Sequence, residues 1–488
     1  MRFVIFTIGL FLSAFASGQN KYSEEYEAFK RQAIQDYDDF RDRANAEYAR
    51  YMRDAWAWYR GEKPMPVPTI EEPVVPPVIL PEDDRGKTPD ERPMPFDEIV
   101  PAPAPVPEPQ PISPIEEKPQ PVEQWLHFVF YGTPCKVRFD AAESVLLNNI
   151  RENAVADMWE RMMTSCNNLL CDCLDLRNSM KLCDWAYVKL AETVANTIYG
   201  SGHSNEAVLL QSFILNQSGF KIHIARSDNH RLHMLLAADC DMYNYPYWKL
   251  NGEHYYLLDH SGVDGLNIFT RTFPEEQPMR LSIAQEQRFS GKLSSERTLQ
   301  AERYPAVSAT VVANMNLMDF YNEYPASYAN NDPLTKWRFY AQVPLSRVAQ
   351  ERLYPALRAA ISGKSERDAA NMLINFVQTA FVYEYDDKVW GCDRAFFADE
   401  TLYYPYSDCE DRSILFSRLV RDLLGLEVVL VYYPGHLATA VKFNEPIPGD
   451  YLSVDGTRYL VCDPTYIHAP IGLTMPDMDN SQAKVIML

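Results

Sequence analysis

Apolar and aromatic side chains recur with a fixed period of eleven residues over residues 25–59. Eleven residues make three turns at about 3.67 residues per turn, which is close to an undistorted α-helix. The pattern therefore predicts one straight amphipathic helix over residues 19–60, with charged side chains on its other faces. The period is carried by Tyr26, Phe29, Ala33, Tyr37, Phe40, Ala44, Tyr48, Tyr51, Ala55 and Tyr59.

Proline dominates the segment that follows this helix. Of the 35 prolines in the chain, 19 lie between Pro64 and Pro121, although proline averages only about 5% of globular sequences. Such a segment favours extended polyproline II structure and acts as a semi-rigid spacer. We therefore predict that residues 61–121 form an acidic, disordered linker between the helix and the folded part of the chain.

The N-terminus has the features of a secretory signal. Arg2 precedes an apolar run from Phe3 to Ala16, which is shorter than the roughly 20 residues that a bilayer requires. Small residues at Ala14 and Ala16 suit a cleavage site, so we interpret residues 1–18 as a signal peptide. We expect an exported protein, periplasmic, secreted or at the cell surface, with no membrane span in the mature chain.

Charge and cysteine content narrow the function classes. The formal net charge of −21 disfavours binding to nucleic acid, whose phosphates repel an acidic chain. Nine cysteines in an exported protein suggest disulfides, with simple burial as the alternative. CxxC pairs or interleaved histidines, which a structural metal site would use, are lacking, so we expect neither a metal nor a cofactor. The cysteines that crowd together are Cys166, Cys171, Cys173 and Cys183.

The most informative pattern lies near the C-terminus. Cys409 opens a stretch with helical apolar spacing that Gly425 stops, and a β-branched strand follows over residues 426–433. His436 begins a second strand, and Asp463 ends a third. A cysteine at a helix start, a histidine to take its proton and an acid to orient that histidine are the groups that thiol acyl transfer requires.

Structural interpretations of the same residues stay open. Cys409 could be a buried or disulfide-bonded cysteine, His436 a core histidine, and Asp463 the acid of a strand-ending turn. The acidic neighbours Asp408 and Glu410 also oppose a thiolate at Cys409, unless they pair with nearby arginines.

Three motifs in this region together resemble the transglutaminase-like superfamily, which has a papain-like fold. They occur in family order over about 125 residues, and they are Asp408-Cys409-Glu410-Asp411-Arg412-Ser413, Gly435-His436 and Cys462-Asp463-Pro464-Thr465. The resemblance implies that Cys409 is the nucleophile, His436 the general base and acid, and Asp463 the orienting residue. It implies attack on a peptide or amide carbonyl through a thioester. Members include cross-linking enzymes, proteases and deglycosylating enzymes, so the substrate stays open.

A degenerate copy of this region precedes it. When Gly219 is aligned with Gly425, His230 falls on His436 and Asp259 matches Asp463, whereas His203 takes the place of the cysteine. We therefore predict an α+β protein in which residues 122–265 form a degenerate transglutaminase-like domain. Residues 266–345 are expected to form a β-rich connecting module, and residues 346–488 the catalytic domain.

The function that these patterns favour is a cysteine peptidase or amide hydrolase acting on a protein or peptide. One alternative is a non-catalytic scaffold or binding protein with a vestigial triad, and another is a protein cross-linking transglutaminase. The amphipathic helix, over residues 21–60, would either dock onto the protein's own domains or mediate self-association or partner binding.

Overall fold

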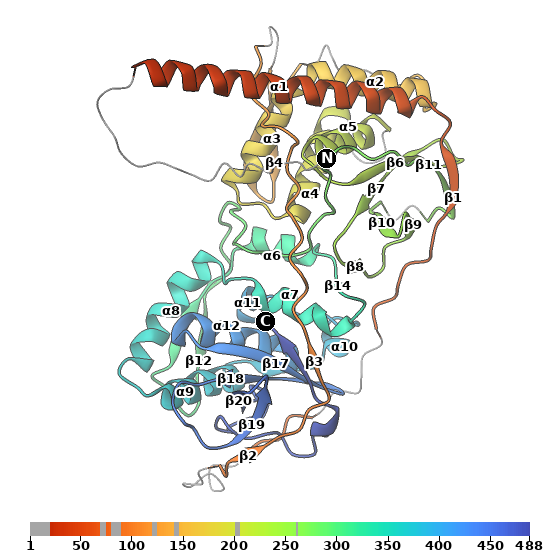
Figure 1. Cartoon of the computed structure of the whole chain (residues 1–488). Helices are drawn as coiled ribbons and strands as arrows, with labels where there is room; N and C mark the ends of the chain where they lie inside the picture. Colours follow the sequence, from red (N-terminus) through yellow and green to blue (C-terminus); the bar gives the residue numbers. More distant parts are fainter. Residues whose placement is uncertain are drawn as a thin grey trace.

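The computed structural model describes residues 20–68, 75–79, 89–119, 124–140, 146–200, 205–259 and 262–488. The chain forms two lobes, stacked one above the other in Figure 1, and each lobe packs helices against an antiparallel-rich sheet. The expected mixture of helices and strands is thus confirmed. The predicted signal peptide lies outside the described residues. Among the helices that the structure describes, none combines the length and apolar character needed to cross a bilayer.

The first lobe is built on a six-stranded sheet with the order β1-β11-β6-β7-β10-β9, in which all neighbours are antiparallel. Its core is filled by large buried side chains such as Trp159, Phe213 and Phe220. A separate hairpin, β4–β5, packs against α3 and α4. The elements are α1 (Asn20–Met52), β1 (Ala57–Arg60), β4 (Gln124–Phe130), β5 (Thr133–Phe139), α2 (Glu152–Ser165), α3 (Asn167–Ser179), α4 (Asp184–Tyr199), α5 (Asn205–Gln217), β6 (Ile222–Arg226), β7 (Leu232–Ala237), β8 (Asp241–Met242), β9 (Tyr247–Leu250), β10 (Glu253–Leu257) and β11 (Gly265–Phe269).

The second lobe contains a seven-stranded sheet with the order β2-β19-β20-β18-β17-β21-β3. Helix α12 packs against β17 and β18 of this sheet and against α7, α9 and α11. The elements of this lobe are β2 (Arg92–Pro93), β3 (Glu98–Val100), β12 (Arg297–Gln300), β13 (Ser308–Val311), α7 (Lys336–Gln342), α8 (Arg347–Ile361), α9 (Glu366–Thr379), β15 (Val382–Tyr383), α10 (Asp386–Val389), α11 (Ala398–Tyr403), β16 (Tyr406–Ser407), α12 (Cys409–Leu424), β17 (Glu427–Tyr433), β18 (His436–Lys442), β19 (Asp450–Val454), β20 (Thr457–Cys462) and β21 (Lys484–Met487). Between β13 and α7, α6 (Met315–Asn322) packs in the core of the first lobe and β14 (Ser327–Tyr328) pairs with β8.

The two sheets share one strand arrangement. In the first lobe α5 is followed by strands that pair in the order β11-β6-β7-β10-β9, and in the second lobe α12 is followed by strands in the order β21-β17-β18-β20-β19. Each neighbouring pair within these five-strand sets is antiparallel. A helix followed by five strands in the same spatial order is therefore present twice in the chain.

The expected β-rich module over residues 266–345 is not a separate unit. Strand β11 completes the first sheet, whereas the β12–β13 hairpin contributes Leu299 and Val311 to the core of the second lobe. The rest of this region includes helices α6 and α7. Its apolar residues have no core of their own to fill, so they divide between the cores on either side.

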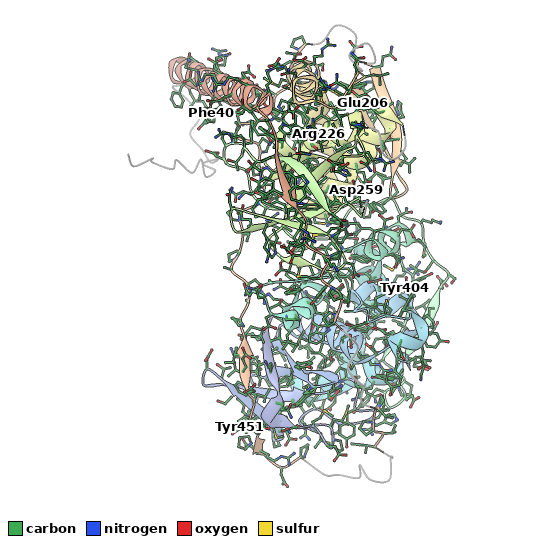
Figure 2. All side chains as sticks on the ribbon, turned by 90° about the vertical axis from the view of Figure 1, so that its right-hand side faces the viewer. Phe40, Glu206, Arg226, Asp259, Tyr404 and Tyr451 are labelled. Atoms are coloured by element: carbon green, nitrogen blue, oxygen red, sulfur yellow. The ribbon has the colours of Figure 1, made fainter. Side chains whose placement is uncertain are left out.

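Helix α1 is shorter than the eleven-residue repeat predicts. It ends at Met52. Residues 57–60 instead form β1, which pairs along its whole length with β11 and lies at the edge of the first sheet. Only the C-terminal half of α1 docks on its own lobe, where Tyr48 and Met52 are buried. The N-terminal half extends beyond the lobe and exposes its aromatic side chains, including Phe29 and Phe40 (Figures 1 and 2).

The described parts of the proline-rich segment, residues 61–68, 75–79 and 89–119, are docked rather than forming a free spacer; they are called the proline strap below. The strap adds β2 beside β19 and β3 beside β21, which lie at opposite edges of the second sheet. The guanidinium of Arg92 donates two hydrogen bonds of 2.8 Å to the two carboxylate oxygens of Asp450. Proline is tolerated here because the strap occupies sheet edges and extended structure.

The strap then returns to the first lobe, as Figure 1 shows. There Arg177 donates to the carbonyl of Pro109, and the side-chain amide of Asn168 pairs with both backbone groups of Lys118. Gly219 meets the backbone of Gln110 so closely that a Cβ atom would lie 2.0 Å from its carbonyl oxygen. Backbone groups that proline leaves without regular partners are thus satisfied by polar side chains of the first lobe.

The cysteine cluster does not form the expected disulfides. Cys171, Cys173 and Cys183 carry free thiols. Cys171 and Cys173 are two residues apart on α3, and such positions point to different faces of a helix. Burial raises the pKa of Cys173, so these cysteines act as small apolar side chains, as the alternative interpretation expected.

Candidate active site

Cys409 is the first residue of α12. The helix begins here because Asp408 and Asp411 form a capping box, in which each side chain accepts a hydrogen bond from the other's backbone N–H. The helix ends at Gly425, which adopts the left-handed conformation that favours glycine. These two features set the ends of α12 and place Cys409 at its first position, where only 7% of the residue is exposed.

His436 begins β18, directly after the turn at Pro434 and Gly435. Strand β20 is the antiparallel neighbour of β18, so its last residue and the following Asp463 lie at the same end of the sheet as His436. The Oγ of Ser413 on α12 donates to the carbonyl of Leu437, 2.8 Å away, which ties the helix start to the strand start. The topology therefore brings together the three residues that the sequence selects.

His436 and Asp463 form a buried hydrogen-bonded pair. Nε2 of His436 lies 2.8 Å from Oδ2 of Asp463. The other carboxylate oxygen of Asp463 accepts from the backbone N–H groups of Thr465 and Tyr466, so the acid cannot rotate freely. Nδ1 of His436 is buried and has no hydrogen-bond partner within the described chain. That nitrogen is thus available to take a proton from the thiol.

Cys409 and His436 line one cavity of about 170 Å³. Pro68 of the proline strap and residues of α7, α10 and β17 complete its walls. The lining residues are Pro68, Pro333, Leu334, Lys336, Trp337, Tyr383, Tyr385, Asp386, Asp387, Asp393, Asp408, Cys409, Glu410, Tyr432, Gly435, His436 and Leu437.

The thiol of Cys409 is neutral at rest. Its Sγ donates to a carboxylate oxygen of Glu410 at 3.2 Å. Burial raises the pKa of Cys409 well above its ordinary value, and the charges of Glu410 and Asp408 add to this, whereas the backbone N–H of Leu437 works in the opposite direction. The raised pKa therefore favours the thiol form of Cys409 over the thiolate.

The acidic neighbours do not pair with the arginines that the sequence offers. Arg412 donates instead to Ser407 and to the carbonyls of Gln378 and Phe381, and Arg418 pairs with Asp422. Carboxylate oxygens of Asp386, Asp393 and Glu410 come within 4.8 Å of one another. These three oxygens, or a second set from Asp408, Cys409 and Glu410, are where a cation could be held.

Trp337 is a site residue that the sequence motifs did not reveal. Its ring stacks on Tyr432 at 5.5 Å, and its Nε1–H is buried beside the cavity without an acceptor in the described structure. It lies 72 positions before Cys409, outside all three motifs. An indole N–H without an acceptor is a suitable donor for the oxyanion that acyl transfer creates.

In the first lobe, the histidine that pairs with Asp259 differs from the one that the alignment suggested. His230 sits in the turn between β6 and β7 with a positive φ and an exposed side chain. His233 of β7 instead lies 2.6 Å from Asp259 and 2.9 Å from Oγ of Ser227. Figure 2 marks Asp259 in the first lobe. His203 and Ser204, at the position matching Cys409, lie outside the described residues.

Comparison with protein-family models, curated proteins and solved structures finds no match.

Proposed function

We propose that the chain is a thiol enzyme of the transglutaminase-like superfamily, with a papain-like second lobe, that hydrolyses peptide or amide bonds. The observation that carries the proposal is the His436–Asp463 pair, which leaves Nδ1 of His436 without a partner in the described chain, together with the cavity that His436 and Cys409 both line. The resemblance of the three motifs supports the same assignment of roles.

In the proposed reaction Sγ of Cys409 attacks the carbonyl carbon while its proton passes to Nδ1 of His436. A C–S bond forms, and the carbonyl π electrons move to oxygen. In this proposal the Nε1–H of Trp337 stabilises the negative charge on that oxygen. When the oxyanion collapses, the C–N bond breaks and the leaving nitrogen takes the proton from His436. The product of this half-reaction is a thioester and a free amine.

Water completes the cycle. It attacks the thioester carbonyl and gives a proton to Nδ1 of His436, and the C–S bond then breaks as the proton returns to sulfur. The net products are a carboxylic acid and an amine, and the thiol is restored. The proposed role of Asp463 is to orient the ring and to stabilise the imidazolium.

Acylation by an activated ester tests this proposal directly. With p-nitrophenyl acetate, we expect one equivalent of nitrophenol to be released in a burst and acetyl to be found on Cys409 by peptide mapping. Cys409→Ala should lose the burst, and His436→Ala should slow it about 100-fold or more. The exposed thiol of Cys392 is a built-in control, and acetylation there but not at Cys409 would refute the assignment.

The same experiment separates hydrolysis from cross-linking. If water resolves the thioester, adding a primary amine such as glycine ethyl ester leaves acetate as the main product. If the amine competes effectively at millimolar concentration, the acetylated amine accumulates, and the enzyme is then a cross-linking transglutaminase rather than a hydrolase.

A further inference from the structure

One wall of the thiol cavity is strongly acidic. Five carboxyl groups line it, and the ammonium of Lys336 is the only side-chain cation among the described lining residues. Lys336 Nζ is already engaged, at 2.5 Å from Asp393. The acidic lining residues are Asp386, Asp387, Asp393, Asp408 and Glu410.

Arginines that lie near this wall do not neutralise it. Arg394 pairs with Glu400 at 2.5 Å. The guanidinium of Arg412 donates hydrogen bonds to Ser407 and to two backbone carbonyls. Neither arginine belongs to the cavity lining. Most of the carboxyl groups on the wall are therefore left without an ion-pair partner from the described chain.

Asp408 provides an independent sign of a missing cation. It is 92% buried, its exposed fraction being 8%, and its Oδ1 accepts no hydrogen bond from any donor in the described chain. The neighbouring side chain is another carboxyl, Glu410, whose Oε2 accepts a hydrogen bond from the weak thiol donor of Cys409. A buried carboxylate oxygen without a donor is costly, so the pair requires either a shared proton or a cation from outside the chain.

The remaining walls suit an organic cation rather than a bare metal ion. Aromatic rings of Trp337, Tyr383, Tyr385 and Tyr432 face the same space, and the ammonium of Lys336 already lies 4.8 Å from the ring centre of Trp337. Aromatic faces attract ammonium and guanidinium groups but offer a hard metal ion no good ligand. Because Cys409 and His436 line this cavity, the ligand that the proposed function implies for it is the substrate.

We propose that the acidic and aromatic wall binds the cationic side chain of a lysine or arginine that supplies the attacked carbonyl. This inference rests on the proposed function and adds its substrate class. The ammonium or guanidinium lies between the carboxylates of Asp386, Asp408 and Glu410 and the aromatic rings. Its charge takes the place of the shared proton, and its position delivers the adjacent carbonyl to Cys409.

A pair of isosteric substrates tests the inference. Acyl-lysine and acyl-norleucine aminomethylcoumarin amides have side chains of similar length and differ in the terminal ammonium. We expect kcat/KM to be at least about tenfold higher for the lysine compound, since a focused negative field raises the local concentration of a cation by about 10-fold or more. Asp386→Asn should reduce this ratio several-fold. Glu384→Gln is the matched control, because Glu384 pairs with Lys388 outside the cavity.

A second readout does not depend on turnover. Cationic, neutral and anionic methanethiosulfonates are compared in their rates of modifying Cys409, followed by peptide mapping, with 2-mercaptoethanol as the reference thiol. We expect the cationic reagent to modify Cys409 fastest and the anionic reagent slowest. The range of these rates should be smaller in Asp386→Asn than in Glu384→Gln.

The outcomes distinguish the two proposals. If Cys409 is never acylated by the ester, the proposed function fails, whatever the charge preference. If acylation occurs but lysine and norleucine substrates react equally, only the cationic substrate class is overturned. If micromolar Ca²⁺ or Zn²⁺ abolishes the preference for cationic reagents, the wall is a metal site, and the inference is likewise overturned.

Discussion

His436 presents Nε2 to Asp463 at 2.8 Å and leaves Nδ1 buried without a hydrogen-bond partner in the described chain. Asp463→Ala should therefore reduce kcat for amide hydrolysis about 100-fold or more, because the ring loses both its orientation and the partner of its positive charge. Asp463→Asn retains one oxygen acceptor and should fall between the wild type and the alanine variant. Thermal unfolding of each variant checks that the fold persists. Equal activity of Asp463→Ala and the wild type would contradict the assigned role.

Trp337 is predicted to act on the transition state rather than on substrate binding. Trp337→Phe retains an aromatic ring to stack on Tyr432 but removes the Nε1–H. We expect kcat to decrease about 100-fold, as for the loss of one oxyanion donor, with KM nearly unchanged. Steady-state kinetics with a coumarin amide measure both constants. An increase in KM at constant kcat would instead assign Trp337 to binding.

The buried carboxyl of Asp386 makes the stability of the protein depend on pH. Burial, together with the charge of Glu410, raises the pKa of Asp386 to about 8, so between its unfolded value and about 8 the folded state binds more protons. Its contribution therefore favours folding less as the pH rises through this interval. The groups that face it are Lys336, Asp387, Asp393, Arg394, Asp408, Glu410 and Asp411.

Asp386→Asn should remove this part of the pH dependence. We expect the variant to be more stable than the wild type at pH 8 by at least about 1.4 kcal/mol, the equivalent of one pKa unit. The two proteins should be similar near pH 4. Urea denaturation at both pH values measures the difference, and a constant difference across the range would argue against a titrating Asp386.

The two halves of α1 should respond differently to the same substitution. Tyr48 is 3% exposed and packs against Trp159 and Phe269, whereas Tyr37 is 53% exposed on the projecting half. Tyr48→Ala should lower the free energy of unfolding by about 3 kcal/mol. Tyr37→Ala should change it by less than about 0.5 kcal/mol, as measured by chemical denaturation.

Docking of the proline strap on the first lobe depends on Gly219. An alanine there would need both a left-handed backbone, at φ +90°, and space that the Gln110 backbone occupies. Gly219→Ala should therefore make residues 101–119 more sensitive to proteases. Gly200→Ala is the matched control, because its φ is +95° but no atom lies within 4 Å of its Cβ position. Equal proteolysis of both variants would show that backbone strain alone is responsible.

The local sequence patterns predicted those residues of the site that lie on consecutive elements joined by short connections. Cys409, His436 and Asp463 follow one another through a helix, a hairpin and neighbouring strands, so their place in each element was enough to predict that they meet. Trp337 and Asp386 reach the cavity from other segments, and no local motif marks them. Trp337 is positioned by the packing of α7 against α12, and Asp386 accepts a hydrogen bond from the backbone N–H of Arg394. No periodicity of the sequence contains these contacts.

Two predictions from the sequence, the match of His230 to His436 and the free proline-rich linker, were wrong for physical reasons. His230 was matched to His436 because a gapless alignment does not allow for the turn between β6 and β7, which is longer than the Pro434–Gly435 turn. The strap was predicted to be free because proline-rich composition is the same for a docked and a solvated segment. What decides between them is a set of distant partners, such as Arg177 and Asn168.

The pairing of β3 with β21 has a consequence for biosynthesis. Glu98 and Lys484 form an ion pair across 386 positions of sequence, so β21 is synthesised long after the strap. The edge of the second sheet therefore cannot close until β21 has been made, although the strap is made early. Contacts of such long sequence separation slow folding. Until β21 is made, β3 of the strap lacks its pairing partner. The prolines and acidic residues of the strap disfavour aggregation of this unpaired segment.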